Sequence, residues 1–62
     1  MMSEVLEKIR REKTELRRLE AKLLAEYKKG HEYLAPAIHS IKDRIHELTL
    51  LEARMVRVAK IT

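Results

Sequence analysis

The single glycine and the single proline of this 62-residue chain stand six positions apart, close to its centre. Gly30 and Pro36 belong to the two residue types that interrupt helices most strongly. The segments on both sides keep the three- and four-residue spacing of apolar side chains that is typical of amphipathic helices. The sequence therefore predicts an all-α single domain, in which helices over 3–29 and 36–60 are joined by a turn over 30–35.

The residues around the turn favour a tight connection. Lys28 and Lys29 precede Gly30, which suits a basic last turn followed by a glycine in the left-handed conformation. Pro36 fits the start of the second helix, because its missing N–H would be unpaired there in any case. A short connection between two long helices makes them antiparallel neighbours. The expected architecture is an antiparallel two-helix hairpin of the coiled-coil type.

The chain is too short to bury a large core. A domain of this size buries only about 60% of the surface that its unfolded chain exposes, and small scaffolds usually add disulfides, a metal or a second subunit. The sequence has no cysteine, which excludes disulfides and thiolate zinc sites, and it is 39% charged and 45% hydrophobic, as in long amphipathic helices. We therefore expect a homo-oligomer, with a homodimeric four-helix bundle favoured over larger assemblies.

The apolar side of the first expected helix has one polar interruption. Glu12 and Lys13 fill the positions between Ile9 and Leu16. At 100° per residue, the apolar residues that fall on this side are Met2, Val5, Ile9, Leu16, Leu19, Leu23 and Tyr27.

The second helix has a matching interruption. Its apolar seam runs through Ile38, Ile41, Ile45 and Leu48, after which the stripe is expected to slide to Leu51, Met55, Val58 and Ala59. The position that continues the original spacing holds Glu52. With the turn near residue 33, both interruptions lie at one height, and they predict a polar layer of Glu12 and Lys13 near Glu52 and Arg54 that fixes the register. The alternative is that these side chains extend past the seam to water.

The C-terminal half of the second helix carries apolar residues on more than one face. Such a helix is usually buried on more than one face, and in a two-helix protein the additional cover must come from another chain. The expected oligomer interface comprises Ile45, Leu48, Leu50, Leu51, Met55, Val56, Val58 and Ile61. The alternative for Leu50 and Ile61 is simple exposure near a fraying helix end.

Metal and catalytic chemistry have little support in the sequence. His39, Asp43 and His46 are spaced so that they share one helical face, and imidazole and carboxylate groups bind transition metals. That face lies opposite the apolar seam, so we expect a solvated polar face without a metal. A single glycine cannot form a phosphate-binding loop, and no cysteine nucleophile exists. We expect no cofactor, no catalytic residue and no enzymatic activity.

The basic residues provide a competing interpretation. The net charge is +4, and residues 1–29 contribute most of it, with nine Lys/Arg against six Glu. Stripes of cations along a helix can follow phosphates. The possible nucleic-acid contacts are Arg10, Arg11, Arg17, Arg18 and Lys28. Interspersed glutamates and the lack of stacking aromatic side chains on that surface argue against this interpretation.

Protein–protein interaction is therefore the expected function, and nucleic-acid backbone binding by the basic face of the first helix is the alternative. The chain would act as a small non-enzymatic regulator, adaptor or assembly factor through homo-oligomerisation and helix-surface docking. No stretch approaches the ~18 apolar residues of a membrane span, and Met1–Arg10 lacks the apolar core of a signal peptide. The expected location is cytoplasmic, without membrane association.

Overall fold

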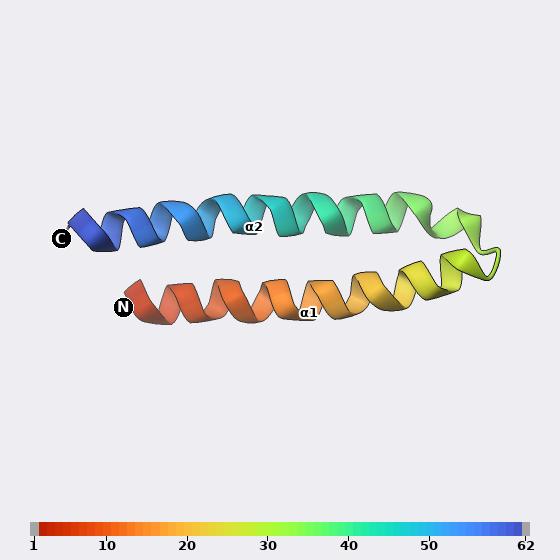
Figure 1. The fold of residues 1–62 in the computed structure, drawn as a ribbon, viewed down its shortest axis with the longest axis horizontal. Helices are drawn as coiled ribbons and strands as arrows, with labels where there is room; N and C mark the ends of the chain where they lie inside the picture. The colour runs from red at the N-terminus through yellow and green to blue at the C-terminus, as the bar shows by residue number, and fades with distance from the viewer. Residues whose placement is uncertain (1, 62) are drawn as a thin grey trace.

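The computed structural model describes residues 2–61, and the side chains of 3–60. It is all-helical, without a strand in this part of the chain, and consists of α1 (Met2–Lys28), a short 3₁₀ helix η1 (Glu32–Leu34) and α2 (Ala35–Ile61). The two long helices lie side by side and antiparallel, so that both termini are at one end and the turn is at the other (Figure 1). The bounds differ from the expected helices, 3–29 and 36–60, by one residue at each end.

Gly30 ends α1 in a conformation that favours glycine. Its φ is +110°, a region that residues with a Cβ rarely enter. The Gly30 N–H donates to the Tyr27 carbonyl at 3.0 Å, and the His31 N–H donates to the Glu26 carbonyl at 3.3 Å. This pair of bonds is the Schellman motif, which satisfies carbonyls that the last turn of a helix leaves unpaired. The predicted left-handed glycine is confirmed.

The chain enters α2 through η1. The Leu34 N–H donates to the His31 carbonyl at 3.1 Å, and the Ala35 N–H donates to the Glu32 carbonyl. Pro36 cannot extend this 3₁₀ ladder because it lacks an N–H. It lies instead in the first turn of α2, where unpaired N–H groups are normal.

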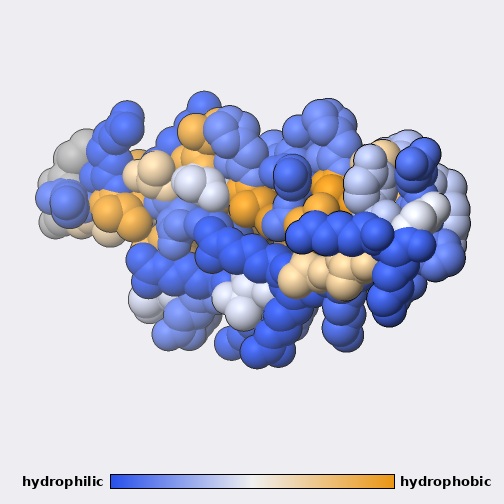
Figure 2. Space-filling view, turned by 45° about the vertical axis from the view of Figure 1, so that its right-hand side comes forward, coloured by the Kyte–Doolittle hydropathy of each residue, from blue (hydrophilic) through white to orange (hydrophobic). Residues whose placement is uncertain are grey.

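The contact between α1 and α2, here called the seam, is formed by side chains that alternate at three and four residues. Among the side chains that the structure describes, the most buried are Ile9, Lys13, Ile38 and Leu48, each exposed by 7% or less. Figure 2 shows hydrophobic side chains along the junction of the helices, interrupted by hydrophilic ones. The seam residues, all buried or half-buried, are Leu6, Ile9, Lys13, Leu16, Glu20 and Leu23 of α1 and Ile38, Ile41, Ile45, Leu48, Glu52 and Met55 of α2.

In α1 the seam differs from the expected apolar side at three of the described positions, Val5, Leu19 and Tyr27, the last of which is 39% exposed. The side chain of Met2 lies outside the described residues. Val5 is 42% exposed and Leu19 is 45% exposed, whereas their neighbours Leu6 and Glu20 are half-buried. The expectation for Val5 and Leu19 was wrong because the alternating spacing places Leu6 and the polar Glu20 in the seam instead. A position in the seam is decided by its angle on the helix, even where a more apolar neighbour is available.

The same spacing overrides hydrophobicity in α2. Glu52 stays in the seam, while Leu51 and Val58 are 42% and 45% exposed and Ala59 is exposed as well. The expected slide of the apolar stripe to Leu51 and Val58 was wrong, whereas Met55 is half-buried in the seam as expected. The side chains of Leu51 and Val58 remain on the surface of the hairpin.

Candidate interaction surfaces

A charged cluster of Arg10, Lys13 and Glu52 connects α1 and α2 across the seam. Lys13 is only 7% exposed, and its Nζ donates to Glu52 Oε1 at 2.9 Å. The Arg10 Nε donates to the other carboxylate oxygen, Glu52 Oε2, at 2.7 Å. The predicted contact between Lys13 and Glu52 is confirmed, and the alternative in which Lys13 extends past the seam to water is wrong. Because Glu52 bonds to both Arg10 and Lys13, which lie one turn apart on α1, these contacts constrain the register of the two helices.

The same contacts set the ionisation of Glu52. The hydrogen bonds from Arg10 and then Lys13 favour the charged carboxylate and lower the pKa of Glu52 below its ordinary value, an effect that partial desolvation opposes. Glu52 therefore stays ionised between its two cations at neutral pH. The positive charge of Arg10 is consequently engaged within the protein.

Glu12 lies beside this cluster and pairs elsewhere. The Arg44 Nη2 donates to Glu12 Oε1 at 3.3 Å, and the Arg44 Nη1 donates to Glu47 Oε2 at 3.3 Å. Arg54 is exposed. The expectation that Glu12 and Arg54 complete the polar layer was wrong, because Glu12 lies one position off the seam and reaches an arginine along the edge of α2. The Glu12–Arg44 pair shows that the edge of α1 that carries Glu12 lies beside the edge of α2 that carries Arg44.

The displaced apolar side chains lie along this edge. Val5 and Leu19 are seven residues before and after Glu12, and Leu51 is seven residues after Arg44. A separation of seven residues is about two turns and returns to the same side of a helix. We call this surface the apolar face; it comprises Val5, Leu19, Leu51 and Val58, each at least 42% exposed.

The remaining residues of the expected interface are distributed over other surfaces. Leu48 is 3% exposed and Ile45 is half-buried, so both pack within the hairpin. Leu50 is 52% exposed and lies on the outer side of α2. Val56 is half-buried on the edge away from the apolar face, and the side chain of Ile61 lies outside the described residues.

The opposite surface of the hairpin is basic. Arg17 and Lys28 are seven residues before and four residues after Leu24, so all three share one edge of α1. Leu24 lines a hollow together with Lys42 of α2, which places Lys42 on the same surface. We call this surface the basic face; it comprises Arg10, Arg17, Lys28 and Lys42.

The expected nucleic-acid residues therefore divide between two surfaces. Arg10, Arg17 and Lys28 belong to the basic face, whereas Arg11 and Arg18 lie on the outer side of α1, by helical angle. Lys42 was missed by the sequence analysis. It stands on the other helix, and its place beside Leu24 depends on the register of the two helices.

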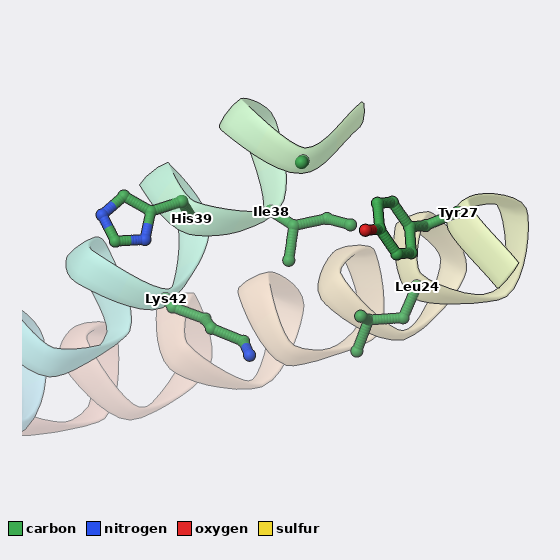
Figure 3. Close-up of a pocket in the computed structure, with 6 residues that line it drawn as sticks. Leu24, Tyr27, Ile38, His39 and Lys42 are labelled. Atoms are coloured by element: carbon green, nitrogen blue, oxygen red, sulfur yellow. The ribbon is translucent and has the colours of Figure 1, made fainter. Parts of the chain in front are cut away.

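The hollow between the helices near the turn contains an exposed tyrosine. It measures about 160 Å³ and is lined by Leu24, Tyr27, Ala35, Ile38, His39 and Lys42. Tyr27 reaches from α1 toward Ile38 of α2, and His39 and Lys42 complete the rim from α2 (Figure 3). Tyr27 is 39% exposed. The expectation that the basic surface lacks a stacking aromatic side chain is corrected by this position of Tyr27.

The histidine and aspartate side chains of α2 stay on the surface. His39 Nε2 lies 3.5 Å from Asp43 Oδ2, with the two side chains 78% and 65% exposed. Within the described residues, no three His, Cys, Asp or Glu side chains are grouped so that they could hold a metal ion. Over the same residues, neither helix combines the length and the apolar character that a membrane span requires.

No protein-family model matches the chain, and no curated protein or solved structure is significantly similar to it. The apolar face, the basic face and the charged cluster between them are the features of this chain from which a function can be inferred.

Proposed function

We propose that this chain is a small non-enzymatic helical interaction module, a regulator, adaptor or assembly factor, that works as a homodimeric four-helix bundle. The observation that supports this proposal is the surface area of the single hairpin. The chain exposes 5071 Å², whereas a compact monomer of 7.4 kDa exposes about 4200 Å². The excess of roughly 900 Å² is close to the ~800 Å² that each partner buries in a standard protein interface.

The apolar face is the surface on which the second copy docks. Val5, Leu51 and Val58 are each at least 42% exposed and lie in the half of the hairpin where α1 begins and α2 ends. Apolar patches of this kind on small proteins mark interaction sites. Burying them against a copy gives each chain the second layer that a two-helix protein lacks.

The charges on the apolar face and on the basic face also favour association through the apolar face. The apolar face is bordered by both signs, with Arg44 between Glu12 and Glu47. A two-fold interface places the same patch on both sides, so acids and bases can meet across it. The basic face would instead bring Arg17 and Lys42 against their own copies, and like charges across an interface are costly.

Two leucines that are adjacent in α2 provide a matched test. Leu51 belongs to the apolar face, and Leu50 lies on the outer side of the same helix. Leu51→Glu would place an unpaired charge in the dimer interface, while Leu50→Glu leaves that charge in water. In sedimentation equilibrium at micromolar concentration, we expect twice the chain mass for the wild type and for Leu50→Glu, and a monomer for Leu51→Glu.

Far-ultraviolet circular dichroism serves as the control for folding. A helical wild type with the mass of one chain would contradict self-association. A Leu51→Glu variant that keeps both its mass and its helicity would contradict the assignment of the interface to the apolar face.

A further inference from the structure

The hollow beside Tyr27 is open to solvent and has about the volume of one planar ring, with an apolar and aromatic lining. A cavity of about 150 Å³ holds a benzene molecule, and the hollow measures about 160 Å³. Leu24 and Ile38 supply an apolar floor, and the half-exposed ring of Tyr27 supplies an aromatic surface (Figure 3). A single heterocycle fits this space, and a larger ring system would project from it.

The hollow is bordered by cations and by the carboxylate of Asp43, which lies 3.5 Å from the rim residue His39. Lys42 is on the rim, and Lys28 and Arg17 lie about one turn and two turns from Leu24 along the same edge of α1. Within the described residues, no ion pair engages Arg17, Lys28 or Lys42. The carboxylate of Glu52 is already bonded to Arg10 and Lys13. A ligand at this place would thus meet cations whose charge is not neutralised within the chain.

A ring-sized hollow inside a row of cations combines the two elements of single-strand recognition, aromatic stacking and a basic path for the backbone. We propose that the basic face binds single-stranded nucleic acid, with one pyrimidine base in the hollow against Tyr27 and the neighbouring phosphates at Arg17, Lys28 and Lys42. A duplex keeps its bases paired and stacked, so it could use the cations but not the hollow. This proposal does not depend on self-association, because the apolar face lies on the opposite side of the hairpin.

Substitutions of the two tyrosines test the role of the hollow. The probe is a short fluorescent oligouridine, and its binding is measured by anisotropy in low salt. Tyr27→Leu keeps an apolar side chain but removes the stacking surface, and we expect the Kd to rise about fivefold or more. Tyr27→Phe should bind like the wild type. Tyr33→Leu is the matched control, because Tyr33 is 75% exposed and does not line the hollow.

Substitutions of two lysines test the path of the backbone. Lys42→Gln removes a cation from the rim of the hollow, and Lys22→Gln removes the same charge from the outer side of α1. We expect Lys42→Gln to weaken binding and to reduce the slope of log affinity against log salt by about 0.7. Lys22→Gln should leave both quantities close to those of the wild type. Circular dichroism of each variant verifies that the hairpin remains folded.

A comparison of three ligands separates binding of a single strand from binding of a duplex and from binding of a free nucleotide. The proposal predicts that oligouridine binds more tightly than a duplex of equal length, and that uridine monophosphate competes weakly. Equal binding of the duplex, or equal effects of Lys42→Gln and Lys22→Gln, would overturn it in favour of nonspecific charge attraction. Strong competition by uridine monophosphate would assign the hollow to a free nucleotide, and an unchanged Kd for Tyr27→Leu would exclude the hollow from binding.

Discussion

Leu48→Ala should destabilise the hairpin by about 2–3 kcal/mol. Leu48 is 3% exposed and is one of only three buried apolar residues in the described part of the chain. Truncation of a buried leucine to alanine costs about 2–5 kcal/mol, depending on how completely the site can collapse or fill. No described side chain is fully buried, so the space left by Leu48 opens toward water, and we expect the lower half of this range. Since a core of this size supplies about 3–5 kcal/mol in total, the variant should be close to unfolding.

Leu50→Ala is the control for this prediction. It removes the same atoms from a side chain that is 52% exposed, and surface changes of this kind usually stay within about 0.5 kcal/mol. The assay is urea unfolding followed by circular dichroism at one fixed protein concentration, because the stability of an oligomer depends on concentration. Equal losses for the two variants, or a Leu48→Ala midpoint like that of the wild type, would refute the seam described here.

Two further predictions concern the turn and the charged cluster. Gly30→Ala places a Cβ where no atom lies within 4 Å, so its cost is purely conformational, about 1–2 kcal/mol at positive φ. Thermal unfolding should show a lower midpoint for Gly30→Ala, with a smaller loss for Gly30→Asn. An unchanged midpoint would contradict the Schellman motif. Because its folded pKa is lowered, Glu52 contributes stability above the pKa of an unfolded glutamate and loses it as pH falls through the lower folded pKa. Glu52→Gln should therefore be less stable than the wild type at neutral pH and equally stable in acid, and a stability gap that stays constant with pH would contradict the pairing.

The hairpin could be predicted because its determinants are local. Gly30 and Pro36 act on their own backbone, and the contact between Lys13 and Glu52 followed from matching two polar interruptions across a turn of known position. The exact seam was harder to predict, because Val5 and Leu19 are apolar enough to be expected in it, while Glu20 looks like a surface residue. The signal that finds Leu6 and Glu20 is the strict alternation of three and four residues through Ile9, Leu16 and Leu23.

The apolar face and the basic face depend on information that neither helix carries alone. Tyr27 and Lys42 lie 15 positions apart in the sequence, and they line one hollow only because the turn sets the register between α1 and α2. Leu51 was expected in the seam, but Glu52 occupies that position, bonded to Arg10 and Lys13, and Leu51 is 42% exposed. Helical angle alone also does not predict the contacts of long side chains that extend along an edge, such as that of Arg44 with Glu12.

The mass of the wild-type chain in solution tests the central claim most directly, which is that the hairpin forms half of an assembly. Sedimentation equilibrium over a range of micromolar concentrations should give twice the 7.4 kDa of one chain, with dissociation toward the monomer on dilution. A stable, helical species with the mass of one chain over the whole range would contradict the account.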